Sequence, residues 1–234
     1  MYLKRWLQWG SRWLKRGTPG YCAFCLAPAA EGRGWCHRCI AELPWNLQSC
    51  KQCGDPVTNA QALCGHCLVE PPAFSTTHAG LLYQDAIKAL VHDFKFHASP
   101  RAGMLLFELM LLTPPVSKGD ALLPVPMHPV NARTRGFNQS HWLAQQLARN
   151  FAMPLVSAKR VKNSPSQRTL NRSERAANLA GAFVVETKLP RHVVIVDDVV
   201  TTGSTGHALA SAALKAGAER VDIWAVARTP LGKD

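Results

Sequence analysis

Residues 193–205 read VVIVDDVVTTGST, and this stretch decides the fold class. It opens with four β-branched apolar residues, a pattern typical of a buried parallel strand. The strand ends in Asp197 and Asp198, and a polar loop follows. An Ala- and Leu-rich pattern over residues 207–216 predicts a helix, and residues 221–227 predict another strand. The segment therefore predicts one β-α-β unit of an α/β protein with a mostly parallel sheet and flanking helices.

The polar residues after the strand form the candidate ligand site. Ligands of such sheets bind at the carboxyl ends of the strands. The carboxylates of Asp197 and Asp198 can accept hydrogen bonds from a vicinal diol. The loop over residues 201–205 offers hydroxyl and N–H groups at a helix N-terminus, where a phosphate is stabilised. A ribose 5-phosphate fits both halves, whereas the alternative, a capped helix start, needs only one such residue.

A second strand–loop–helix segment precedes this one. Residues 122–126 predict a strand and residues 138–150 a helix, with Arg133 and Arg135 in the loop between them. Cations in such a loop suit a pyrophosphate. A solvated basic loop is the alternative, and it is the better interpretation for Arg133 taken alone.

The most basic part of the chain follows. Residues 159–175 are polar, turn-rich and basic, and they lead into a predicted helix at 171–179 and a strand at 181–185. A charged mobile loop beside a phosphate site can close over a substrate. A solvated surface loop fits the same composition equally well.

All eight cysteines lie between residues 22 and 67, in four CxxC pairs whose first members recur every fourteen residues. Two such pairs supply the four thiolates of a tetrahedral zinc site, and four sulfurs leave no open position. We therefore expect two structural Zn²⁺ ions, with either sequential or interleaved pairing. The predicted ligands are Cys22, Cys25, Cys36, Cys39, Cys50, Cys53, Cys64 and Cys67.

The net charge of +12 over 234 residues points to a polyanionic partner such as nucleic acid, a phosphate-rich ligand or an anionic membrane surface. No run of about 20 apolar residues predicts a membrane span. The basic N-terminus lacks the features of a signal peptide, so we expect a cytoplasmic protein with reduced thiols. Residues 1–18 fit an amphipathic helix at a membrane surface, on nucleic acid or against the core.

The stretch 193–205 resembles the phosphoribosyl pyrophosphate (PRPP) motif of type I phosphoribosyltransferases. The resemblance implies that Asp197 and Asp198 bind the ribose hydroxyls, that the loop holds the 5′-phosphate and that Mg²⁺ accompanies the pyrophosphate. We expect Asp197, Asp198 and Arg135 to be catalytic. The expected PRPP-binding residues are Val196, Asp197, Asp198, Thr201, Thr202, Gly203, Ser204 and Thr205, together with Arg133 and Arg135.

The chain as a whole is similar to the ComF/GntX family. The resemblance rests on the CxxC pairs, residues 125–129, residues 135–140, residues 167–175 with Asn178 and residues 181–183, and the PRPP motif. It implies a double zinc ribbon followed by a type I phosphoribosyltransferase-like domain. We therefore expect a basic arm at 1–20, a double zinc ribbon at 21–72 and the transferase-like domain at 73–234.

Two functions remain open. The first is a PRPP-dependent phosphoribosyl transfer to an acceptor that the sequence does not identify, in DNA uptake, natural transformation or the use of DNA as a nutrient. The second is a non-catalytic adaptor that binds single-stranded DNA and uses its PRPP site for regulation. The family resemblance implies a DNA-uptake helicase or competence proteins as partners.

Overall fold

The computed structural model describes residues 20–29, 33–58, 62–115, 117, 119–128, 130, 132, 133, 136–162, 179 and 181–232. The chain divides into two compact units, residues 1–43 and residues 44–234. Several predicted segments lie outside the described residues: the basic arm up to residue 19, Arg135, the predicted helix at 171–179 except its last residue, and most of the 159–175 loop. The division into a 21–72 double ribbon and a 73–234 domain stays a prediction.

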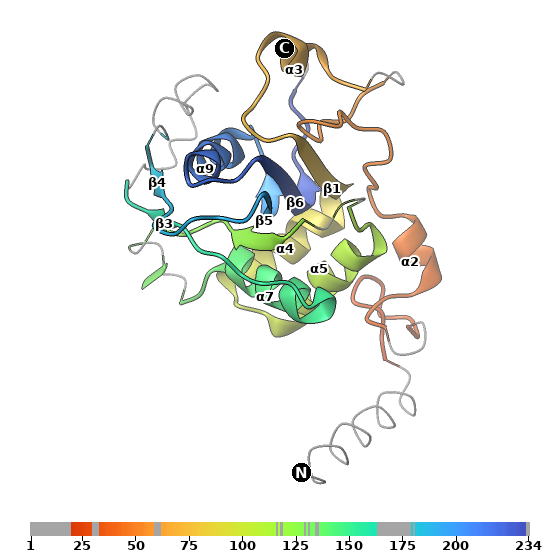
Figure 1. Ribbon diagram of the computed structural model, residues 1–234. Coiled ribbons are helices and arrows are strands. Elements are labelled where there is room, and N and C mark those ends of the chain that lie inside the picture. The colour runs from red at the N-terminus through yellow and green to blue at the C-terminus, as the bar shows by residue number, and fades with distance from the viewer. Residues whose placement is uncertain are drawn as a thin grey trace, which may run out of the picture. The chain divides into compact units, whose positions relative to one another are not determined.

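The larger unit is built on a parallel sheet (Figure 1). Within the part of the chain that the structure describes, the sheet has four strands in the order β1-β6-β5-β2. These strands are β1 Thr76–Leu82, β6 Arg220–Arg228, β5 His192–Val200 and β2 Ala121–Pro124. The parallel α/β sheet predicted from the sequence is confirmed.

Strand β5 lies inside the sheet, with β6 on one side and β2 on the other. Ile195 is in register with Leu123 of β2 and with Ile223 of β6. The four apolar residues at positions 193–196 are at most 1% exposed. Both faces of the strand are therefore covered, which explains its unbroken apolar run.

Helix α9 (Ser204–Lys215) covers one face of the sheet (Figure 1). Its buried residues Leu209, Ala210 and Ala213 share one apolar cluster with Ile195 and Ile223. The helix begins three residues earlier than the sequence pattern predicts, because the polar residues of the loop supply its first turn.

Helices α4 (Asp85–Phe96), α5 (Pro100–Leu112) and α7 (Gln139–Phe151) cover the other face (Figure 1). In α4 the buried residues Ile87, Val91 and Phe94 follow helical spacing. The side chain of Asn138 caps α7 by accepting a hydrogen bond from the backbone N–H of His141 (3.1 Å). The helix predicted at 138–150 is thus confirmed.

Short elements complete the described chain. Strands β3 (Lys159–Arg160) and β4 (Phe183–Val184) form an antiparallel pair. Helix α2 (His37–Ala41) lies in the smaller unit, and α3 (Gly65–Val69) lies in the larger one. None of the described helices is long and apolar enough to span a bilayer.

Candidate functional site

The loop that follows β5 places its polar residues at the start of α9. Gly203 has a φ of +81°, a left-handed conformation that favours glycine, and it is the N-cap of α9. The hydroxyls of Thr202 and Ser204 lie 2.9 Å apart, and the backbone N–H of Ser204 donates to Thr202 Oγ1 (3.3 Å). The loop therefore holds hydroxyl groups next to the positive end of a helix dipole.

This loop and Asp197 line the same cleft. The apolar residues that line the cleft are Val125, Ile195, Val199, Val200 and Ile223. Its polar side is formed by Asp197 and by the loop and helix positions Thr201, Gly203, Thr205 and Gly206. A carboxylate and a phosphate-type loop thus face one space at the carboxyl end of β5, as the β-α-β pattern predicts.

The carboxylate of Asp197 is held from the start of α7. Ser140 Oγ donates a hydrogen bond to Asp197 Oδ1 (2.9 Å), and the backbone N–H of Asp198 donates to the same oxygen (2.9 Å). Burial and the neighbouring Asp198 carboxylate raise the pKa of Asp197 to about 7. The group is therefore poised to change its protonation near neutral pH.

Asp198 has a different partner, Lys95 near the end of α4. Lys95 Nζ lies 2.8 Å from Asp198 Oδ2, and the two side chains are 22% and 8% exposed. The backbone N–H of Val199 also donates to Asp198 Oδ1 (2.7 Å). Burial lowers the pKa of Lys95, but the Asp198 carboxylate outweighs this and leaves the pKa raised, so the lysine is protonated.

Contacts between α4 and the start of α7 support Lys95. The Phe94 ring packs edge-on against Phe137 and Trp142, with centroids 5.2 and 5.3 Å away. Gln139 Nε2 donates to the backbone oxygen of Lys95 (3.4 Å). The run at 135–140 that stands out in the sequence therefore contributes Phe137 to packing against α4 and Ser140 to the site.

The structure places the remaining predicted residues as follows. Val196 is fully buried in β5. Arg133 is exposed, and Arg135 lies outside the described residues, so the pyrophosphate-binding role of both stays a prediction. Lys95 and Ser140 were not predicted. The one sequence signal for Lys95 is a cation between two phenylalanines, Phe94 and Phe96.

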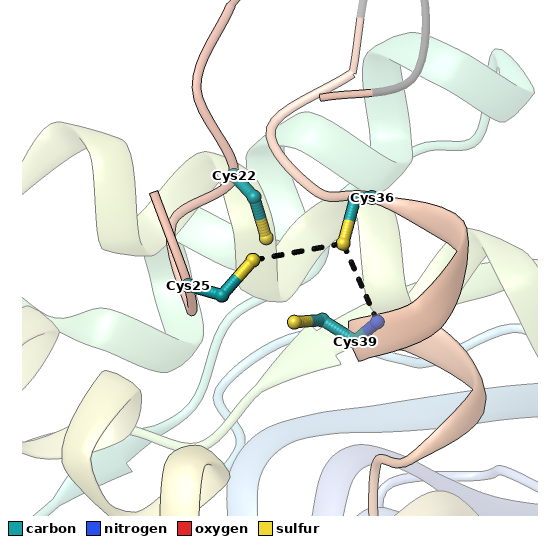
Figure 2. Close-up of side chains that lie close together, drawn as sticks. All are labelled: Cys22, Cys25, Cys36 and Cys39. Carbon is teal, nitrogen blue, oxygen red and sulfur yellow. Dashed lines mark hydrogen bonds between the residues drawn. The ribbon is translucent and has the colours of Figure 1, made fainter. Parts of the chain in front are cut away.

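The first cysteine cluster consists of Cys22, Cys25, Cys36 and Cys39 (Figure 2). Figure 2 shows the four side chains pointing toward one common centre, with Cys36 and Cys39 at the start of α2. The sulfurs of Cys25 and Cys36 lie 3.7 Å apart. Four thiolates at 2.3 Å from one tetrahedral Zn²⁺ lie about 3.8 Å apart, so this cluster fits a zinc ion.

The second cluster consists of Cys50, Cys53, Cys64 and Cys67. The sulfurs of Cys53 and Cys64 lie 3.6 Å apart, and the backbone N–H of Cys64 donates to Cys50 Sγ (3.3 Å). All eight cysteines are free thiols. Each cluster joins two CxxC pairs that are consecutive in the sequence, so the pairing is sequential. Each cluster fits one structural zinc ion with no open position.

One further group of possible metal ligands occurs among the described residues, His92, Asp93 and His97 at the end of α4. All three are exposed, and His97 Nδ1 lies 3.1 Å from Asp93 Oδ1 as an i,i+4 pair. This geometry is that of a solvated helix end.

Comparison with known proteins agrees with this architecture. Residues 17–68 match the family model of the double zinc ribbon domain, and residues 138–233 match that of the phosphoribosyl transferase domain. DNA utilization protein YhgH of Shigella flexneri is 34% identical over 223 residues, which cover 91% of this chain and 98% of that protein. The chain belongs to the ComF/GntX family.

Further proteins are similar to parts of the chain. Within the ComF/GntX family, competence protein F of Haemophilus influenzae is 32% identical over 206 residues, 82% of this chain and 88% of that protein. Among solved structures, orotate phosphoribosyltransferase from Aeropyrum pernix shares 19% identity over 55% of this chain and 61% of that chain, with a TM-score of 0.35. The two family models confirm the predicted combination of a double zinc ribbon with a phosphoribosyl transferase domain.

Proposed function

We propose that this chain binds PRPP in the cleft at the carboxyl end of β5 and acts in the uptake or use of DNA. One observation carries the first part: Asp197 lines the same cleft as the loop residues Thr201, Gly203 and Thr205. A carboxylate beside a helix N-terminus is complementary to a ribose that carries a 5′-phosphate.

In this proposal Asp197 and Asp198 accept hydrogen bonds from the two ribose hydroxyls. The loop at 201–205 holds the 5′-phosphate, and Mg²⁺ enters with the pyrophosphate and neutralises part of its charge. Arg133 and Arg135 contact the pyrophosphate. Lys95 then has two roles, since it compensates Asp198 in the free protein and adds positive charge beside the ligand.

The reaction that such a site supports is transfer of the phosphoribosyl group. A nucleophile on the acceptor forms a bond to the anomeric carbon while the bond to pyrophosphate breaks, and the acceptor loses a proton. Asp197, Asp198 and Arg135 would contribute mainly by positioning the ligand and stabilising charge. The adaptor alternative keeps the same PRPP site without transfer.

The DNA part of the proposal is supported by the names of two relatives, DNA utilization protein YhgH and competence protein F, and by the net charge of +12. We propose a cytoplasmic protein that contacts single-stranded DNA through phosphate-binding cations, alongside competence or helicase partners. Binding of this kind weakens steeply with salt. Fluorescence anisotropy with a labelled single strand over a range of NaCl concentrations tests it, and an affinity independent of salt would contradict it.

Isothermal titration of the zinc-loaded protein with PRPP and Mg²⁺ tests the ligand. The double variant Asp197→Asn/Asp198→Asn should lose at least tenfold in affinity. The matched control is Asp93→Asn, which neutralises a carboxylate that is 56% exposed on α4. Absence of binding by the wild-type protein would overturn the PRPP site, and with it both phosphoribosyl transfer and regulation by PRPP, and would leave only the DNA-binding part of the proposal.

A further inference from the structure

The second cysteine cluster is joined to the sheet of the larger unit by hydrogen bonds. The backbone N–H of Thr77 in β1 donates to the carbonyl oxygen of Lys51 (3.0 Å). Asn46 Nδ2 donates both to the carbonyl of Gly54 (2.9 Å) and to that of Ala79 in β1 (3.1 Å). The cluster and the sheet are thus parts of one compact unit.

Arg228, the last residue of β6, connects this cluster to the loop at residues 201–205, which we call the phosphate loop. Its side chain is fully buried. Arg228 Nε donates to the carbonyl of the zinc ligand Cys53 (2.9 Å), and Nη2 lies 3.5 Å from Asp55 Oδ1. Nη1 of the same guanidinium donates to the carbonyls of Val200 (3.1 Å) and Thr201, where the phosphate loop begins.

A second connection runs through Phe74. Gln52 lies between two ligands of the cluster, and its Nε2 donates to the carbonyl of Phe74 (3.3 Å). The Phe74 ring, only 1% exposed, packs against Gly203 and Gly206, where an added Cβ would meet it at 3.7 and 3.4 Å. The hydrogen bonds of Arg228 and the packing of Phe74 therefore both connect the second cysteine cluster with the same loop.

We infer that the second four-cysteine centre, through Arg228 and Phe74, positions the phosphate loop, so that zinc at this centre sets the affinity of the cleft for its ligand. Arg228 is the positioning residue, because one planar guanidinium spans the Cys53 carbonyl and the loop carbonyls. The first four-cysteine centre belongs to the other compact unit and has no such assigned role.

The experiment compares two variants of the full-length chain that each lose two thiolates. Cys53→Ser/Cys64→Ser disrupts the second centre, and Cys25→Ser/Cys36→Ser is the matched control at the first. Zinc content should fall from two ions to one in both. Amide hydrogen exchange of residues 199–206 without ligand should accelerate at least tenfold only in the second-centre variant, while exchange in residues 193–196 reports on the intact sheet.

Arg228→Lys separates positioning from loss of metal. It should retain two zinc ions yet accelerate exchange in the loop, because an ammonium cannot span the same carbonyls. Arg220→Lys is the control on the same strand, since Arg220 is 47% exposed and pairs with Asp222. If the second-centre variant fails to fold, Arg228→Lys decides the question. Loop exchange as slow as in the wild type would overturn the inference.

PRPP titration of the same variants adds a functional readout, and this part rests on the proposed function. Affinity should fall at least tenfold in the second-centre variant and in Arg228→Lys, and stay within twofold in the two controls. Absence of PRPP binding by the wild-type protein would contradict the proposed function alone, because the exchange measurement needs no ligand. Unchanged affinity in both affected variants would overturn the role of zinc in the cleft.

Discussion

Asp197 and Asp198 are adjacent in the sequence, yet the protein gives them different surroundings. Asp197 lines the cleft and accepts a hydrogen bond from Ser140, whereas Asp198 pairs with Lys95 on the α4 side. The two carboxylates therefore differ in their electrostatics before any ligand arrives.

The raised pKa of Asp197 predicts a stability that depends on pH. Between its ordinary value of 3.8 and about 7, the native carboxyl holds a proton that the unfolded chain has released. The free energy of unfolding therefore falls as pH rises through this window. Above it the native protein bears the full free-energy cost of ionising the buried Asp197. Asp197→Asn removes the ionisation, so the variant should be more stable than the wild type. The difference in free energy of unfolding should grow with pH to about 2–4 kcal/mol at pH 8. Urea unfolding at pH 5, 6, 7 and 8 measures it.

The measurements of the wild type and Asp197→Asn at pH 5 serve as a control for those at pH 8. At pH 5 most of the native Asp197 is protonated, so the variant and the wild type should be much closer in stability than at pH 8. A stability difference that stays constant over the whole range would contradict the raised pKa.

The ion pair between Lys95 and Asp198 gives a second prediction. Lys95→Met leaves the carboxylate of Asp198, only 8% exposed, without its cation. We expect a loss of about 2 kcal/mol in the free energy of unfolding at pH 7, because an uncompensated buried charge is costly. The control is Lys88→Met, an exposed lysine on the same helix. Equal urea midpoints for the two variants would contradict the role assigned to the pair.

Individual strands, loops and helix ends could be predicted because each depends on residues that are neighbours in the sequence. The apolar run of β5, the polar loop and the capped start of α7 are all readable from neighbouring residues. The partners of the site could not, because they come from distant positions. Lys95 reaches Asp198 from another helix, and Arg228 reaches Cys53 across 175 residues. No periodicity or spacing encodes such pairs, so only the folded chain reveals them.

The packing of α9 on β6 leaves no space for a side chain at Gly206. An added Cβ would lie 2.4 Å from Ile223 Cδ1, and both residues line the cleft. Gly206→Ala should push the isoleucine methyl into the cleft and reduce PRPP affinity at least tenfold. Stability should change by no more than about 1 kcal/mol, because alanine favours the helix.

Calorimetric titration and urea unfolding of Gly206→Ala separate these two effects. Gly65→Ala is the matched control, the same substitution at a helical glycine with no atom within 4 Å of the added Cβ. A loss of stability with PRPP affinity intact would contradict this account of α9.

For the molecule as a whole, the compact units divide between Leu43 and Pro44, inside the segment that carries the cysteine repeat. A chain that starts at residue 44 should therefore fold, bind one zinc ion and unfold cooperatively. A chain that starts at residue 73 should lose at least about 3 kcal/mol, because the buried Arg228 then lacks Cys53 and Asp55. Zinc content and urea unfolding of both chains check this. Equal stability of the two chains would show that the second cluster is dispensable.

The strand order also governs how the chain can fold. Strand β1 pairs with β6, so that Thr76 is in register with Asp222, far along the chain. During synthesis β1 must therefore wait for its partner until the chain has been made as far as β6. Closing so long a loop makes completion of the sheet slow and late, and leaves an apolar strand edge open to wrong partners in the meantime. Newly made chains should accordingly depend on chaperones until β6 is in place.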